Sequence, residues 1–170
     1  MNIKTFIKKH EWYYKNTDIT DAHFPAPKKK VNIEGATLLP LDKYYSNTQS
    51  VLDMLKEKGL RPATIHELIE YVDAHWSEIK GAGKWYPALG SIWEDAGGGH
   101  RVPGVDAGSG GGFDFGLGDF ESAWDDGRVV LVFSDKSLET KATNKHLDSS
   151  EPLKLISEIE ERLAKLKKLV

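Results

Sequence analysis

The spacing of apolar residues predicts an amphipathic helix that begins after Asn47. Val51, Leu52 and Leu55 fall on one face of such a helix. Asn47 is a residue type that caps helix N-termini, and Gly59 stands where a helix commonly ends. Both limits of this first helix are therefore marked in the sequence.

A second helix is predicted directly after the first. Pro62 precedes it, and Thr64 and Glu67 have the spacing of a capping box, in which each side chain bonds the other's backbone N–H. Only a short connection separates the two helices. The apolar residues of the second helix repeat at helical spacing: Ile65, Leu68, Ile69, Val72 and Trp76.

From Lys84 onward the apolar residues form short pieces separated by glycine clusters, a pattern typical of strands and tight connections. The last piece, "RVVLVFS", is a continuous apolar run that ends at Ser134. Another short strand is predicted within residues 36–45, with a turn at Pro40. These elements predict an α+β fold in which two helices pack on short, loop-rich antiparallel strands.

The two ends of the chain differ from this central domain, which we place at residues 36–148. Residues 1–35 are expected to form an N-terminal extension, in which Ile3 and Phe6 share one helical face. Residues 149–170 predict a C-terminal amphipathic helix with the apolar spacing of a coiled-coil seam. Packing of this helix on the domain and self-association into a homo-oligomer both remain open.

The composition is that of an ordinary globular protein of 170 residues, and it excludes several classes of site. The chain has no cysteine, which excludes disulfides and thiolate metal sites. A net charge of −3 argues against general nucleic-acid binding. No apolar run approaches the roughly 20 residues of a membrane span, and no secretory signal stands out. We therefore expect no nucleic-acid partner, no membrane span and, by default, a cytoplasmic location.

Acidic residues and glycines are concentrated in one part of the chain. Between Trp85 and Asp135 there are nine acidic residues, two basic ones and no lysine. Fourteen of the 16 glycines lie between Gly81 and Gly127. Because glycine loses more backbone freedom on folding than any other residue, so many of them within a folded domain require a structural reason.

Three motifs in the sequence resemble sites of known chemistry, but each lacks an essential part. "HELIE" (His66–Glu70) has a glutamate where the second zinc-binding histidine would stand, so we expect a solvated helix face there. The glycine region has no lysine for a phosphate-binding loop. "GSGGGFDF" leads into strand-like residues, whereas a dinucleotide-binding loop opens a helix.

The acidic residues leave two further functions open. A pair of carboxylates such as Asp125 and Asp126 would suit a hydrolase that uses one acid and one base. The same segment, "WDDG", offers hard oxygen ligands for Ca²⁺ in a structural module. We nevertheless expect no enzyme activity, no resident metal and no cofactor.

Aromatic and aliphatic residues recur throughout the glycine region and would hold it against a core. Between them, glycine and aspartate favour turns, and loops held on a rigid scaffold are where binding commonly takes place. His100, Arg101 and Phe120, with the acids around them, would supply the contacts. This mixture of aromatic, small and polar groups suits the recognition of a protein or another macromolecule better than catalysis.

The order of elements resembles the C-type lectin-like fold. "RPATIHELIEY", followed by "ALGSIWED", "VPG" and "SAWDDGRVVLVF", is similar to the variable proteins of diversity-generating retroelements over about residues 36–135. In that family, mutagenesis at adenines rewrites chosen codons, and a lectin-like scaffold displays the altered side chains in a ligand-binding face. AAC and AAT codons never yield Lys, Gln or Met by this route, and residues 85–135 contain none of the three.

The resemblance implies fixed scaffold anchors and a variable face within about residues 94–126. The anchors would be Leu89, Gly90, Trp93, Pro103, Leu117 and Trp124. The variable, ligand-binding positions would be Asp95, His100, Arg101, Val102, Asp106, Ser109, Asp114, Phe115, Asp119, Phe120, Ser122, Asp125 and Asp126. Calcium-dependent sugar binding is not expected, because "VPG" and "WDD" lack oxygens of the lectin calcium motifs.

Overall fold

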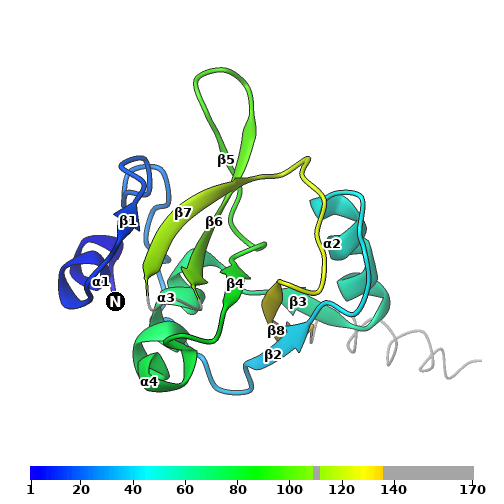
Figure 1. The fold of residues 1–170 in the computed structure, drawn as a ribbon, viewed down its shortest axis with the longest axis horizontal. Coiled ribbons are helices and arrows are strands. Elements are labelled where there is room, and N and C mark those ends of the chain that lie inside the picture. Colours follow the sequence, from blue (N-terminus) through cyan, green and yellow to red (C-terminus); the bar gives the residue numbers. More distant parts are fainter. Residues whose placement is uncertain (109–111, 136–170) are drawn as a thin grey trace, which may run out of the picture. The chain divides into compact units, whose positions relative to one another are not determined.

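The computed structural model describes residues 1–108 and 112–135, which form a mixed α/β arrangement with four helices and two sheets rich in antiparallel pairs. Residues up to Ser134 form one compact unit (Figure 1). The predicted C-terminal helix, residues 149–170, and Ser109 lie outside the described residues. No helix among the described residues is long and apolar enough to cross a membrane.

Both central helices are confirmed. The Asn47 side chain accepts a hydrogen bond from the backbone N–H of Ser50 at the start of α2 (Thr48–Glu57). At the start of α3 (Ile65–Ala74), Thr64 and Glu67 form the predicted capping box. Helix α3 ends before His75, and Trp76, predicted as part of the same helix, instead begins the separate short helix α4 (Trp76–Ile79). Local capping chemistry therefore sets the starts of both central helices.

The strands form two sheets. In the smaller sheet, β8 (Val129–Ser134) lies between β2 (Thr37–Pro40) and β3 (Leu60–Pro62) and pairs antiparallel with both. The larger sheet has the order β1-β7-β6-β4, with β5 also paired to β6. Its strands are β1 (Tyr14–Lys15), β4 (Lys84–Pro87), β5 (Trp93–Glu94), β6 (His100–Ala107) and β7 (Phe113–Asp119).

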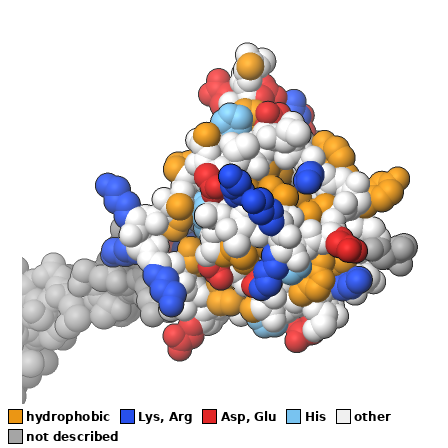
Figure 2. Space-filling view, turned by 90° about the vertical axis from the view of Figure 1, so that its left-hand side faces the viewer, with side chains coloured by type: hydrophobic (Ala, Val, Ile, Leu, Met, Phe, Trp, Pro, Cys, Tyr) orange, Lys and Arg blue, Asp and Glu red, His pale blue; other side chains and the backbone are white. Residues whose placement is uncertain are grey.

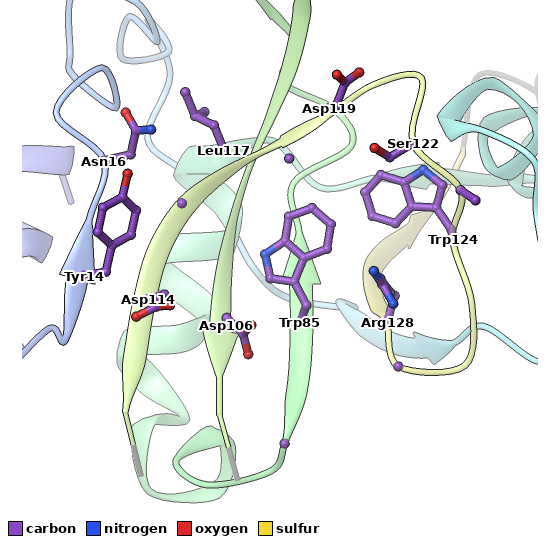
Figure 3. Close-up of a pocket in the computed structure, with 15 residues that line it drawn as sticks. Tyr14, Asn16, Trp85, Asp106, Asp114, Leu117, Asp119, Ser122, Trp124 and Arg128 are labelled. Atoms are coloured by element: carbon purple, nitrogen blue, oxygen red, sulfur yellow. The ribbon is translucent and has the colours of Figure 1, made fainter. Parts of the chain in front are cut away.

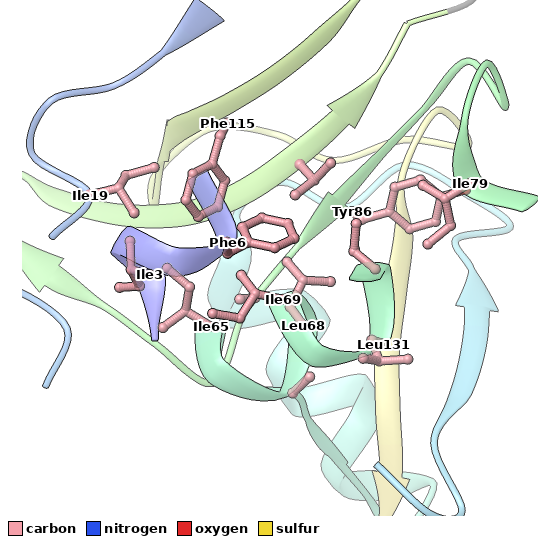
Figure 4. Close-up of a cluster of buried hydrophobic side chains, with 14 of the residues drawn as sticks. Ile3, Phe6, Ile19, Ile65, Leu68, Ile69, Ile79, Tyr86, Phe115 and Leu131 are labelled. Atoms are coloured by element: carbon pink, nitrogen blue, oxygen red, sulfur yellow. The ribbon is translucent and has the colours of Figure 1, made fainter. Parts of the chain in front are cut away.

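Two apolar cores hold these layers together. The larger core packs α3 and α1 (Ile3–Lys9) against the inner face of the larger sheet, with Leu68, Ile69 and Phe115 at its centre (Figure 4). The smaller core joins α2 to the smaller sheet through Val51, Leu55 and other residues. Strand β8 contributes alternate residues to both cores, so it links the two parts of the domain.

Residues 1–35, expected to form an extension, are instead an integral part of the domain. Ile3 and Phe6 of α1 are buried in the larger core, and the Phe6 ring meets that of Phe115 edge-on at 5.4 Å between centroids. The N-terminal ammonium group of Met1 pairs with Glu70 of α3. Strand β1 then pairs parallel with β7 and extends the larger sheet. The sequence prediction of a helical face here was correct, but its role was underestimated.

The "HELIE" motif also differs from its prediction at one position. His66 is buried, where a solvated helix face was expected, and its Nε2 lies 3.0 Å from the backbone oxygen of Phe24. This contact attaches the segment before β2 to α3. Glu67 has the capping role predicted for it: burial raises its pKa, but hydrogen bonds from Arg61 and Thr64 outweigh burial and lower the pKa overall.

If the N-terminal segment is integral to the core, Phe6→Ala should lower the free energy of unfolding by about 3–5 kcal/mol, the usual cost of truncating a buried phenylalanine. Tyr13→Ala is the matched control, since Tyr13 is 88% exposed and its loss should change stability by no more than about 0.5 kcal/mol. Chemical denaturation followed by circular dichroism measures both. Equal stability of the two variants would contradict an integral role.

Candidate ligand-binding surface

The outer face of the larger sheet carries small and acidic residues. Because side chains alternate along a strand, successive residue pairs of β6 and β7 lie on opposite faces of the sheet. Val105 and Phe115 are paired on the inner face and belong to the core. The pairs on the outer face are Asp106 with Asp114, Gly104 with Gly116 and Val102 with Gly118. Glycine thus forms the floor of this face, with an acidic pair at one end.

Two of these glycines make room for the ring of Trp85. A Cβ on Gly104 would lie 2.8 Å from Trp85 Nε1, and a Cβ on Gly118 would overlap the six-membered ring of the same indole. Trp85 of β4 therefore lies flat across neighbouring strands, which any larger residue at these positions would prevent. Gly116 differs, because its Cβ would meet nothing within 4 Å. Part of the glycine floor is covered by Trp85 and part is open.

Trp124 fixes the position of Trp85. The two indoles stack at 4.9 Å between centroids with an interplanar angle of 14°. Trp124 is 1% exposed, and its Nε1 donates a hydrogen bond of 3.0 Å to Thr48 Oγ1 of α2. Its backbone also exchanges two hydrogen bonds with Tyr45. The segment between β7 and β8 is therefore held between the sheet and α2.

These residues surround an open depression of about 560 Å³, which we call the sheet hollow (Figure 3). Tyr14 of β1 lies at one side and Trp85 at the other, with the Asp106–Asp114 pair between them. The segment between β7 and β8 closes the far side. The lining residues are Tyr14, Asn16, Gly83, Trp85, Asp106, Asp114, Gly116, Leu117, Gly118, Asp119, Ser122, Ala123, Trp124, Gly127 and Arg128.

The acidic pair carries negative charge that its surroundings do not fully balance. Partial burial and the neighbouring Asp114 carboxylate raise the pKa of Asp106, against the opposite effect of Arg128. The Oδ1 atom of Asp114 is buried and has no hydrogen-bond partner within the described residues. Because two carboxylates lie side by side here, this end of the sheet hollow is suited to a group with positive charge.

Other acids near the sheet hollow have structural partners. Asp125 accepts a hydrogen bond from the backbone N–H of Gly127 and pairs with Arg128, and these two contacts lower its pKa. Lys84 Nζ donates a bond of 2.8 Å to the backbone oxygen of Asp126. Asp125 therefore stays ionised and shapes the turn before β8.

The hairpin formed by β5 and β6 presents a second, separate surface. Hydrogen bonds from Arg101 and from the backbone of Gly99 and Gly97 lower the pKa of Asp95, so it remains ionised in the turn. Arg101 also pairs with Asp119 at 3.3 Å, which ties the hairpin to the end of β7. This surface and the sheet hollow meet at Asp119.

The structure brings together only part of the predicted variable face. Asp106, Asp114, Asp119 and Ser122 line the sheet hollow, while Asp95 and Arg101 line the surface of the hairpin. His100 is exposed beside Phe120, with ring centroids 6.1 Å apart. Asp125 and Asp126 are exposed in the turn before β8.

The prediction was wrong at Val102 and Phe115, which are completely buried. Val102 belongs to the smaller core and Phe115 to the larger one, so neither can contact a ligand at the surface. Sequence reasoning also missed Tyr14, Asn16 and Arg128. Tyr14 lies at the sheet hollow because β1 pairs parallel with β7, and no local sequence pattern predicts that pairing.

The predicted anchors are packed to different degrees. Leu89, Pro103 and Trp124 are buried, whereas Leu117 and Trp93 are half-buried against the larger core. The Trp93 ring also stacks on His23 at 4.4 Å. Gly90 is exposed but cannot be replaced easily, because a Cβ there would lie 2.8 Å from the backbone oxygen of Ala63. Each of these residues therefore has a packing or steric role.

No group of three or more His, Asp or Glu side chains that could hold a metal ion occurs in residues 1–108 and 112–135. Comparisons of the chain with protein-family models, with curated proteins and with solved structures found no match.

Gly118→Ala should destabilise the protein by about 1–3 kcal/mol, because the added methyl displaces an indole that is already stacked. The tryptophan emission spectrum should change with it. Gly116→Ala is the matched control on the same strand and face, where nothing lies within 4 Å, and it should be neutral or slightly stabilising. Denaturant melts of both variants measure the difference. Equal effects would show that Trp85 does not depend on the glycine floor.

Asp106→Asn should stabilise the protein at pH 7. Because the pKa of Asp106 is raised in the folded state, ionisation of this carboxyl opposes folding. The penalty fades as the pH falls through the ordinary carboxyl pKa of about 3.9, because well below it the carboxyl is protonated in both states. The gain in melting temperature should therefore be present at pH 7 and largely lost by about pH 3. Asp126→Asn, outside the acidic pair, serves as the control. A gain that is independent of pH would contradict the electrostatic cause.

Proposed function

We propose that this chain is a non-enzymatic recognition protein with a C-type lectin-like scaffold, a variable protein of the kind that diversity-generating retroelements encode. It binds a protein or another macromolecular surface through the sheet hollow and the adjacent β5–β6 hairpin. The partner presents basic groups to the Asp106–Asp114 pair. One observation carries this proposal. The stacked rings of Trp85 and Trp124 lie against the glycine floor, and outward side chains beside it, such as that of Asp106, make no contact that the fold requires.

The topology supports a lectin-like scaffold. The strand that precedes the two central helices, β2, pairs antiparallel with the last described strand, β8, and this brings the two ends of residues 36–135 together. The helices α2 and α3 lie between them in sequence, and the short strands β4, β6 and β7 follow. The N-terminal segment, with α1 and β1, is an addition to this plan.

The contacts of the outward side chains indicate which positions are free to vary. No side-chain hydrogen bond or ion pair is recorded for Asp106, Ser122 or Asp126 in the described part of the chain. Substitution there removes no contact that the fold requires. Asp95 and Asp125, in contrast, organise turns through backbone N–H groups. The proposed variable set is therefore smaller than the sequence alone predicts.

The acidic character of the sheet hollow supports a partner with basic groups. An arginine or lysine side chain at this end would pair with the Asp106 carboxylate, whose pKa is raised by burial and by the neighbouring Asp114. Trp85 lines the same hollow and adds apolar contact beside this pair. Such complementarity contributes to the specificity and the rate of association.

A hydrolase with paired carboxylates is the second candidate, and Asp106 with Asp114 supports it better than Asp125 with Asp126. The raised pKa of Asp106 is the kind of perturbation that a general acid requires. The hydrogen bonds that lower the pKa of Asp125 oppose such a role there. The open form of the sheet hollow nevertheless favours recognition of a surface.

A display library tests the proposal. With Asp106, Ser122 and Asp126 randomised, most members should keep the wild-type melting temperature within a few degrees, and selection should yield binders to unrelated target proteins. A matched library at Gly104, Gly118 and Trp124 should mostly fail to fold. Library members that retain Asp106 should be enriched in binders to basic targets, compared with members in which Asp106 is replaced by a neutral residue. Equal tolerance in the two libraries, or no binders, would overturn the proposal.

The DNA around the coding sequence and a direct activity assay separate the alternatives. The retroelement origin predicts a nearby reverse-transcriptase gene and an imperfect repeat of the codons for residues 85–135, with differences only at adenines. Turnover of chromogenic glycosides or esters that Asp106→Asn abolishes would instead establish the hydrolase. A rise in melting temperature with added Ca²⁺, lost in Asp125→Asn, would establish a calcium-binding module.

A further inference from the structure

A second hollow lies between α1 and the segment that follows β1, away from the predicted variable face. It has a volume of about 430 Å³, within the range of small-molecule sites, and its lining is mostly apolar. Ile3 and Ile19 are buried beneath it and Ile7 is half-buried. We call it the lysine groove; its lining residues are Ile3, Lys4, Ile7, Lys8, Lys15, Asn16, Thr17, Ile19, Thr20 and Asp21.

Three lysines surround this apolar floor. Lys4 and Lys8 are four residues apart on α1 and so lie on the same side of the helix, and Lys15 approaches from β1. All three are exposed. Figure 2, which faces the side of the molecule with α1 and β1, shows Lys and Arg side chains beside apolar surface. The groove therefore combines an apolar bottom with a positive rim.

The fold does not account for these charges. No ion pair or hydrogen bond is recorded for the side chains of Lys4, Lys8 or Lys15 among the described residues, whereas the neighbouring Lys9 pairs with Asp73 of α3. Like charges four residues apart destabilise a helix. The single acid of the groove, Asp21, accepts a hydrogen bond of 3.1 Å from the backbone N–H of Ile3. The rim thus keeps a net positive charge.

From this arrangement we propose that the lysine groove binds a single-chain anionic amphiphile such as a fatty carboxylate. The apolar chain lies on Ile7 and on the aliphatic stems of the lysines, above the buried Ile3 and Ile19, where it covers apolar surface that water would otherwise contact. The anionic head lies among the lysines, where it relieves the repulsion between Lys4 and Lys8. A neutral amphiphile gains only the first of these contributions, and a small hydrophilic anion only the second.

Titration with decanoate below its micelle concentration tests the proposal in the full-length protein. Saturable shifts of the methyl resonances of Ile3, Ile7 and Ile19 are expected in NMR spectra. The double variant Lys4→Gln/Lys8→Gln should weaken binding at least tenfold and keep the wild-type melting temperature. Lys28→Gln/Lys29→Gln is the matched control, with the same change in charge outside the groove, and should bind as the wild type does.

Decanol and acetate separate the two contributions, and each should bind at least tenfold more weakly than decanoate. No saturable shift with decanoate, equal affinity for decanol, or equal affinity in the two double variants would overturn the proposal. Binding to anionic phospholipid vesicles without binding to free decanoate would also overturn it and would indicate a membrane-surface role instead. The lysine groove and the sheet hollow share Asn16 among their lining residues, but none of these variants changes a residue of the sheet hollow, so failure of this proposal is distinguishable from failure of the proposed function.

Discussion

The candidate surface depends on one contact, the indole of Trp85 lying on a glycine floor with Trp124 stacked against it. The absence of side chains at Gly104 and Gly118 leaves room for the ring of Trp85. Glycines at neighbouring positions of β6 and β7 allow the ring of Trp85 to lie across the two strands. Trp124, stacked on this ring, is hydrogen-bonded to Thr48 of α2. The entropic cost of ordering glycine is offset by burial of the rings. An irregular segment that would otherwise be flexible becomes a firm support.

Much of the fold could be predicted, because its signals are local. Caps and apolar periodicity define α2 and α3 within a few residues of sequence, and an unbroken apolar run defines β8. The N-terminal segment was misjudged because its value lies in distant contacts, such as Phe6 with Phe115 and β1 with β7. A two-residue strand has no periodicity from which a partner or a register could be predicted.

The candidate site was predicted less well, because the sequence alone did not establish on which face of the sheet each residue lies. Val102 and Phe115 were assigned to the surface by composition and position. Phe115 lies on the inner face of the sheet, in the larger core, whereas Val102 lies on the outer face at a place that the smaller core covers. In β7, however, the sequence "FDF" does show the alternation, because Asp114 faces outward between two buried phenylalanines. Asp114 and Phe115 are adjacent in the sequence, and the alternation of side chains along the strand places Asp114 on the outer face and Phe115 in the core.

Strand β1 covers what would otherwise be an edge of the larger sheet. The carbonyl oxygens of Phe113 and Phe115 accept hydrogen bonds of 2.8 Å from the backbone N–H groups of Tyr13 and Asn16. Without them, β7 would be an open sheet edge with unpaired backbone groups, to which a strand from another molecule could add. The replacement edge is two residues long and carries a charged lysine, which makes it a poor template for such growth. The edge that β1 provides is thus a poorer template for strand addition than an uncovered β7 would be.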